Sequence, residues 1–116
     1  TFGWASNFSF YYAHHLSTIE GGMVCMNDTD LYEAVRMLRG HGMVREMDCP
    51  ARKRAAADQH PDLNPEFIFA YPGFNVRSTE VNAVIGRSQL RRLDAMNQRR
   101  TENLMLFLRN LDPDLY

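Results

Sequence analysis

Hydrophobic and polar residues alternate at the start of residues 5–13, where Phe8 and Phe10 fall on one side of an extended chain and Ser9 on the other. This alternation predicts a short β-strand. Residues 21–26 begin with two glycines and continue with four apolar residues. Such a uniformly apolar run predicts a second strand buried on both faces. We therefore expect two strands joined by a polar turn.

Apolar residues spaced three and four apart predict a helix over residues 30–39. Asp30 and Glu33 resemble a capping box at its start, with an acid in place of Ser or Thr. The Gly40-His41-Gly42 run is expected to end this helix, because glycine tolerates a left-handed C-cap.

The second half of the chain divides into a polar stretch and a helical one. Residues 43–72 contain four of the five prolines and predict mostly loop, with a helical turn near residues 55–58. The helical pattern starts at Ser78, the expected N-cap, and a change of phase near Gln89 predicts two helices or one bent helix. Asp112-Pro113 is expected to end it. The predicted fold class is therefore α/β, with two short strands, three to four helices and a helix-rich C-terminal half.

Composition narrows the possible functions. The chain has 116 residues, 45% of them hydrophobic, and a formal net charge of -1. The near-neutral charge argues against a nucleic-acid partner, and no apolar run is long enough to predict a membrane span. Lys53 is the only lysine beside twelve arginines. Lysine chemistry therefore has a single candidate, in a charged segment expected to be a loop.

The numbers and positions of cysteine and histidine residues do not predict a metal site. Cys25 and Cys49 are too few for a disulfide scaffold or a four-ligand site, and we expect buried or half-buried thiols of a cytoplasmic protein. His14 and His15 are adjacent, so their side chains would point to opposite sides of an extended chain. We predict no metal ligands.

Two clusters of polar residues are candidates for chemistry. The first lies between the two predicted strands and contains hydroxyls, His14, His15 and Glu20. A histidine in such a loop can act as a general base near neutral pH, or the loop can be a solvated turn without chemistry. The second cluster presents Asn75 and Arg77 just before a predicted helix N-terminus, which suits an anion. Its alternative is a capped helix with an exposed arginine.

Several short motifs follow one another in a fixed order along nearly the whole chain. They are Ser9-Phe10, Leu16-Ser17-Thr18, Glu20-Gly21-Gly22, Leu38-Arg39, His41-Gly42, Gly73-Phe74-Asn75-Val76-Arg77, Thr79-Glu80, Ala83, Gln89-Leu90 and Arg99-Arg100. In this order they resemble the DegT/DnrJ/EryC1/StrS sugar aminotransferases. The resemblance implies pyridoxal phosphate as cofactor, nucleotide-linked keto sugars as substrates, and dimers that share active sites.

The resemblance also implies a domain organisation. Members of the family are considerably longer, so we expect a partial chain. Residues 1–42 would be the end of the large cofactor-binding domain, residues 43–72 a proline-rich charged connection, and residues 73–116 the helical start of the C-terminal domain.

His14 stands where typical members of the family carry the lysine that holds the cofactor covalently. This replacement resembles the 3-dehydratase branch, which uses pyridoxamine phosphate to remove the C3 hydroxyl of a nucleotide-linked 4-keto-6-deoxy sugar. The resemblance implies that His14 is the catalytic base and that Ser9 contacts the cofactor phosphate. Asn75 would contact the phosphate in the partner subunit's site. Ile19 stands where the motif commonly has glycine.

Three hypotheses follow from these features. The first is a segment of a 3-dehydratase of deoxysugar and lipopolysaccharide biosynthesis, incomplete as an enzyme by itself. The second is a related aminotransferase that has lost its lysine, and the third is a non-catalytic protein that folds by self-association. The third rests on strand edges and apolar residues that would need a partner: Val24, Phe67, Ile68 and Leu104. We therefore expect a homo-oligomer.

Overall fold

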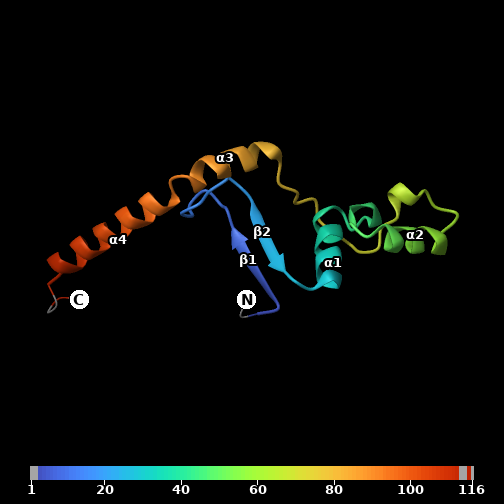
Figure 1. The fold of residues 1–116 in the computed structure, drawn as a ribbon, viewed down its shortest axis with the longest axis horizontal. Coiled ribbons are helices and arrows are strands. Elements are labelled where there is room, and N and C mark those ends of the chain that lie inside the picture. Colours follow the sequence, from blue (N-terminus) through green and yellow to red (C-terminus); the bar gives the residue numbers. More distant parts are fainter. Residues whose placement is uncertain (1–2, 113–114, 116) are drawn as a thin grey trace. The chain divides into compact units, whose positions relative to one another are not determined.

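The computed structural model describes residues 3–112 and Leu115 (Figure 1). Its elements are β1 (Ala5–Ser9), β2 (Gly22–Met26), α1 (Thr29–Arg39), η1 (Val44–Glu46), α2 (Pro50–Gln59), η2 (Pro65–Phe67), α3 (Glu80–Leu90) and α4 (Leu93–Asn110), of which η1 and η2 are 3-10 helices. The α/β class with two short strands and a helix-rich C-terminal half is confirmed. The chain forms two compact units. Unit 1 comprises Thr1–Asn7 and Val24–Arg77, and unit 2 comprises Phe8–Met23 and Ser78–Tyr116.

Strands β1 and β2 pair as a two-stranded antiparallel sheet (Figure 1). β1 ends at Ser9, earlier than predicted, because the chain turns between Tyr11 and His14. The prediction that the second strand is buried on both faces is wrong, since every residue of β2 is exposed except the half-buried Met26. Cys25 is likewise exposed, against expectation, while Cys49 is half-buried. A two-stranded sheet without a covering layer leaves both of its faces open to solvent.

Unit 1 has a small hydrophobic core. It consists of four side chains that are 3–8% exposed: Met37, Met43, Val44 and Ile68. A backbone hydrogen bond links two of these core residues, since the Val44 N–H donates to the Ile68 carbonyl oxygen at 2.9 Å. The expectation that Ile68 needs a partner outside the chain is therefore wrong, whereas Val24 and Phe67 are exposed as expected.

The start of α1 differs from the predicted capping box. Asp28 is the N-cap, and its Oδ1 accepts a hydrogen bond from the Leu31 N–H at 2.9 Å. Glu33 is 3% exposed, and its carboxylate accepts hydrogen bonds from the N–H groups of Asp48 and Cys49 at 2.8 and 2.9 Å. The prediction was wrong because Glu33 binds backbone that is distant in sequence and not the start of its own helix.

The segment over residues 43–72 is more ordered than predicted, because it contains α2 and both 3-10 helices. Pro50 is the first residue of α2, where its missing N–H costs no hydrogen bond. Helix α2 buries no residue, which is why it lacks the apolar stripe that would have predicted it.

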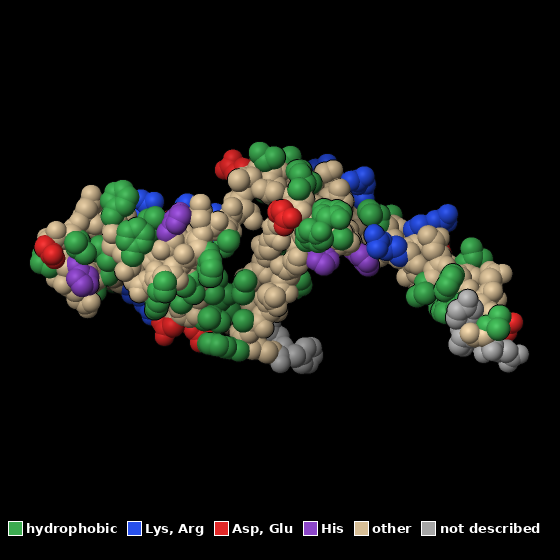
Figure 2. Space-filling model, turned by 180° about the vertical axis from the view of Figure 1, so that it is seen from behind, with side chains coloured by type: hydrophobic (Ala, Val, Ile, Leu, Met, Phe, Trp, Pro, Cys, Tyr) green, Lys and Arg blue, Asp and Glu red, His purple; other side chains and the backbone are tan. Residues whose placement is uncertain are grey.

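In unit 2, Thr79 and not Ser78 is the N-cap of α3, and it forms a capping box with Asn82. The predicted break in the helical pattern is confirmed, since α3 ends at Leu90 and α4 begins at Leu93. Helix α4 ends at Asn110, and the predicted stop at Pro113 lies outside the described residues. Hydrophobic side chains lie on the visible surface of α4 (Figure 2). Leu104 and Phe107 are 55% and 62% exposed.

Candidate functional site

Two of the three predicted site residues lie at the end of β1 and in the loop that follows it: Ser9 is the last residue of β1, and His14 lies in the loop. The ends of this loop are joined by a hydrogen bond from the Phe10 N–H to the Gly21 carbonyl oxygen at 2.8 Å. Thr18, the buried residue of the loop, donates its N–H to the Phe10 carbonyl oxygen at 2.9 Å. These bonds close the loop at its base, and both Ser9 and His14 remain exposed.

Tyr11 connects the serine with the histidine. Its N–H donates to the Ser9 Oγ at 3.4 Å, and its carbonyl oxygen accepts a hydrogen bond from the His14 N–H at 3.0 Å. The ring centroids of Tyr11 and His14 are 6.1 Å apart, with the rings steeply inclined. Sequence reasoning gave Tyr11 no role, and the structure places it between both predicted residues.

The Tyr11 phenol also contacts the neighbouring Tyr12, with ring centroids 4.4 Å apart. The pKa of Tyr11 is raised by a hydrogen bond with the Tyr12 side chain, by desolvation and by the nearby Glu20 carboxylate. The rise moves the ionisation of this phenol further above pH 7, at which an ordinary tyrosine is already neutral.

Asn82 of α3 holds the base of the loop. Its Nδ2 donates to the carbonyl oxygens of Thr18 and Glu20 at 2.8 and 3.1 Å. Helix α3 also approaches Thr18 closely, since a Cβ added at Gly86 would lie 3.0 Å from the Thr18 Cγ2. Sequence reasoning missed Asn82. The only sequence signal was its place three residues after Thr79, where a capping box partner is expected.

Asn75, the third predicted site residue, lies in unit 1 on an extended segment. It forms an isolated antiparallel bridge with Gly40, and its Oδ1 accepts a hydrogen bond from the Arg77 guanidinium at 3.4 Å. Arg77 also forms an ion pair with Glu46 at 3.4 Å. The exposed Arg77 is therefore already paired with a carboxylate, which weakens the case for a free anion site there.

The backbone around Asn75 is fixed where two chain segments cross at close range, one at Gly42 and the other at Gly73. Gly42 has a φ of +80°, and a Cβ at this position would lie 1.8 Å from the Tyr71 carbonyl oxygen. A Cβ at Gly73 would lie 2.2 Å from the Gly42 nitrogen. The His41 N–H donates to the Phe74 carbonyl oxygen beside this crossing at 2.6 Å. Only glycine fits at both positions, so the crossing sets the path that leads to Asn75.

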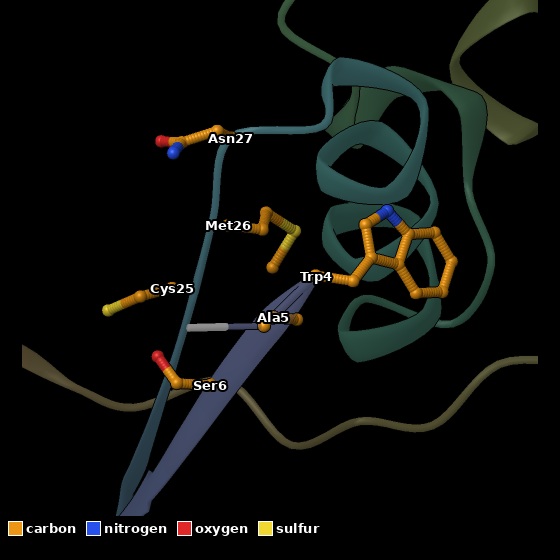
Figure 3. A pocket seen from close by; sticks show the side chains of 7 residues that line it. Trp4, Ala5, Ser6, Cys25, Met26 and Asn27 are labelled. Atoms are coloured by element: carbon orange, nitrogen blue, oxygen red, sulfur yellow. The ribbon is translucent and has the colours of Figure 1, made fainter. Parts of the chain in front are cut away.

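A pocket of about 260 Å³ lies elsewhere in unit 1, at the start of β1 and the end of β2 (Figure 3). Its lining residues are Gly3, Trp4, Ala5, Ser6, Cys25, Met26 and Asn27. The Trp4 indole N–H donates to the Asp28 carboxylate at 3.1 Å, so the ring reaches the start of α1. None of the predicted site residues lines this pocket.

Within residues 3–112 and Leu115, no three His, Cys, Asp or Glu side chains are grouped closely enough to hold a metal ion. No helix there combines the length and apolar character that crossing a membrane requires.

Comparisons with known proteins identify relatives of the chain. The model of the DegT/DnrJ/EryC1/StrS aminotransferase family matches residues 1–113. GDP-4-keto-6-deoxy-D-mannose 3-dehydratase of Escherichia coli O55:H7 is 35% identical over 109 residues, which are 93% of this chain and 28% of the enzyme. GDP-perosamine synthase of Caulobacter vibrioides is 37% identical over 92 residues, or 79% of this chain and 20% of that protein.

Solved structures give the same relationship. The structure of E. coli GDP-4-keto-6-deoxy-D-mannose 3-dehydratase with bound hydrated PLP matches with a TM-score of 0.73 at 33% identity. A histidine-to-asparagine variant of GDP-4-keto-6-deoxymannose 3-dehydratase with bound GDP-perosamine matches with a TM-score of 0.67 at 29% identity. Each match covers 93% of this chain and 28% of the other. The chain thus spans little more than a quarter of the length of these relatives.

Proposed function

We propose a function from the premise that this chain belongs to the DegT/DnrJ/EryC1/StrS aminotransferase family. The chain is a segment of a nucleotide-sugar 3-dehydratase that works with pyridoxamine or pyridoxal phosphate and removes the C3 hydroxyl of a 4-keto-6-deoxy sugar. The observation that carries this proposal is the exposed His14, five residues after Ser9 on the loop between β1 and β2. Similarity to two 3-dehydratases, at 35% and 33% identity, supports the choice of branch.

The donors of the loop fit the phosphate of such a cofactor. The Ser9 oxygen accepts a long hydrogen bond from the Tyr11 N–H, so its own O–H proton is not used in that bond. The exposed hydroxyl can therefore donate to a phosphate oxygen. The side-chain amide of the exposed Asn75 can also donate a hydrogen bond to a phosphate oxygen, and we assign it to the phosphate in a partner subunit's site.

His14 would act as the proton-transfer group. When bound, pyridoxamine phosphate supplies an electron sink for the carbon next to its amine. An imidazole can take up and return a proton at the cofactor's C4′ carbon near neutral pH. It cannot hold the cofactor covalently as a lysine does. The hydrogen bond to the Tyr11 carbonyl fixes the backbone of His14, which limits the positions that its ring can adopt.

An aminotransferase relative that has lost its lysine is the second candidate. It is favoured by 37% identity with GDP-perosamine synthase. Both candidates lack a lysine in the loop between β1 and β2, so this absence does not separate them. The dehydratase is favoured because the two 3-dehydratases match 93% and 92% of this chain, whereas GDP-perosamine synthase matches 79%.

The remaining assignments follow from the same proposal. Residues 1–42 belong to the large cofactor-binding domain, residues 43–72 to a connection, and residues 73–116 to the C-terminal domain of a cytoplasmic biosynthetic enzyme. The substrate is a nucleotide-linked keto-deoxy sugar. The exposed apolar side chains of α3 and α4 support a homo-oligomer, and they equally support a non-catalytic chain that self-associates.

Titration of the labelled chain with pyridoxamine phosphate, followed by NMR, tests the cofactor assignment. We expect selective shifts of the Ser9, Tyr11 and His14 amide signals, which Ser9→Ala weakens by reducing affinity about tenfold. Ser6→Ala is the matched control, because Ser6 is exposed on the same strand but outside the loop. Shifts that Ser9→Ala does not weaken, or no shifts in the loop, would contradict the assignment.

A further inference from the structure

The side-chain amide of Asn82 forms two sets of hydrogen bonds, one through its oxygen and one through its nitrogen. Its Oδ1 accepts hydrogen bonds from the Thr79 hydroxyl at 2.6 Å and from the Thr79 N–H at 3.2 Å. The bond from the Thr79 N–H and the return bond from the Asn82 N–H to the Thr79 Oγ1 at 3.5 Å form the capping box of α3. Its Nδ2 donates to the carbonyl oxygens of Thr18 and Glu20 at 2.8 and 3.1 Å. One side chain therefore joins the first turn of a helix to a loop more than 60 residues away in sequence.

The two carbonyls that Asn82 binds flank a residue in an unfavourable conformation. Ile19 has a φ of +75°, in the left-handed region that β-branched residues rarely adopt. Its side chain is 60% exposed, so burial contributes little to holding it there. The hydrogen bonds from Asn82 on both sides of Ile19 therefore oppose relaxation of this backbone, together with the bond from the Ile19 N–H to the Ser17 Oγ at 3.1 Å.

This conformation is connected to the site residues through the base of the loop. Thr18, held by Asn82, donates its N–H to the Phe10 carbonyl oxygen, and Phe10 follows Ser9 directly. Thr18 also donates its hydroxyl to the Glu20 carbonyl oxygen at 2.8 Å. The space for a Cβ at Gly21 is occupied by the same hydroxyl, since the two atoms would be 2.5 Å apart. Release of the Thr18 and Glu20 carbonyls would thus loosen the closed end of the loop.

We propose that Asn82 is a positioning residue for the loop that carries Ser9 and His14, and that it acts by holding the carbonyls on both sides of the left-handed Ile19. Its role is to position the loop and not to contact substrate or cofactor. Its importance for catalysis rests on the proposed function, whereas the hydrogen-bonded clamp itself does not.

Two variants separate the clamp from the helix cap. Asn82→Asp keeps the oxygen that accepts from Thr79 but removes both Nδ2 donors, so it retains the cap and loses the clamp. Thr79→Ala removes the hydroxyl of the cap and keeps the Asn82 donors. Hydrogen exchange of the Phe10 and Thr18 amides in the full chain, without cofactor, then reports on the base of the loop.

We expect Asn82→Asp to raise the exchange rates of the Phe10 and Thr18 amides about tenfold, while Thr79→Ala changes them less than about threefold. The His14 ring signal in the NMR spectrum should shift or broaden in Asn82→Asp and stay unchanged in Thr79→Ala. Adding Ile19→Gly to Asn82→Asp should restore both readouts, because glycine adopts a positive φ without a clamp.

Equal effects of Asn82→Asp and Thr79→Ala on the loop amides would overturn the proposal, since Asn82 would then act only through the helix. An unchanged His14 signal in Asn82→Asp would overturn it as well. Should Asn82→Asp fail to fold, the double variant Asn82→Asp/Ile19→Gly should fold, because glycine adopts a positive φ without the clamp. Failure of the double variant to fold would overturn the proposal. Failure of cofactor binding with normal loop protection would count against the proposed function and leave the clamp intact.

Discussion

Unit 1 and unit 2 are stabilised in different ways. Unit 1 contains all four buried hydrophobic side chains of the described residues, around Met37 and Val44, and a buried carboxylate at Glu33. In unit 2, Thr18 is the buried residue of the described part, and hydrogen bonds from Asn82 hold the loop. Unit 1 therefore makes its own core, whereas most apolar side chains of unit 2 are exposed.

This difference shows which part of the chain forms a buried hydrophobic core by itself. The apolar residues of α3 and α4 are largely exposed, as at Val84 with 66% and Phe107 with 62%. The relatives are more than three times longer, so most of their residues lie outside the matched segment. We infer that the loop with His14 is built on the less stable part of the chain, and that its precision depends on Asn82.

The largest expected effect is that of Gly42→Ala in unit 1. The added Cβ would collide with the Tyr71 carbonyl oxygen, at a residue with φ of +80°. We expect a loss of more than about 4 kcal/mol in the free energy of unfolding, measured by urea denaturation. Gly3→Ala is the control, because its Cβ would meet only the Ala5 carbonyl oxygen at 3.7 Å. Similar stability of both variants would show that the glycine crossing is not required.

Glu33→Ala should have the next largest effect, because it leaves the N–H groups of Asp48 and Cys49 without their acceptors. We expect a loss of about 3 kcal/mol by thermal or urea unfolding. Glu33→Gln retains one acceptor oxygen and should lose less than Glu33→Ala. Equal losses in the two variants would contradict the role of the carboxylate as a bridge to the segment before α2.

A matched pair of valines compares the units directly. Val44 is 3% exposed in unit 1, and Val84 is 66% exposed in unit 2. Val44→Ala should cost about 2 kcal/mol, because it removes buried apolar surface and leaves a cavity. Val84→Ala should stay within about 0.5 kcal/mol in the monomer, measured at a protein concentration at which light scattering detects no oligomer. A large loss for Val84→Ala in the monomer would contradict the difference between the units, because it would mean that unit 2 has a packed core of its own.

The smallest effect is expected in acid and concerns unit 1. The pKa of Asp48 is lowered by a hydrogen bond from the Tyr32 hydroxyl and by Arg36, and that of Asp28 by hydrogen bonds from the Leu31 N–H and the Trp4 indole. A carboxyl with a lowered folded-state pKa stabilises the fold above its unfolded pKa of about 3.9, and this contribution disappears as the pH falls through the folded value.

We therefore expect unit 1 to lose stability below about pH 4. Asp48→Asn should flatten this part of the pH profile, followed by circular dichroism during acid titration. An unchanged profile in Asp48→Asn would show that its partners do not contribute to acid stability.

Local patterns predicted the two strands, α1 and the break between α3 and α4. They failed where a residue binds something distant in sequence. Glu33 has the spacing of a cap residue, but it captures N–H groups fifteen and sixteen residues later. Helix α2 was predicted only as a helical turn near residues 55–58, because it has no buried residue and therefore shows no apolar stripe.

The candidate site shows the same limit. Ser9, His14 and Asn75 could be named from motifs, because their spacing in sequence resembles that of a family. Tyr11 and Asn82 could not be assigned, since their roles depend on a turn and on a contact across more than 60 residues. Which residues hold a site together is decided by tertiary contacts, and local pattern contains little information about them.

The central claim is that His14 is the proton-transfer residue of a nucleotide-sugar dehydratase. It is tested most directly in a chimera in which residues 3–112 replace the matching segment of the Escherichia coli 3-dehydratase. The measurement is kcat for loss of the sugar C3 hydroxyl, with His14→Ala compared against the adjacent, equally exposed His15→Ala. We predict a fall of at least about 100-fold for His14→Ala and a change within about threefold for His15→Ala. Full activity of the His14→Ala chimera, or equal losses in both variants, would contradict the claim.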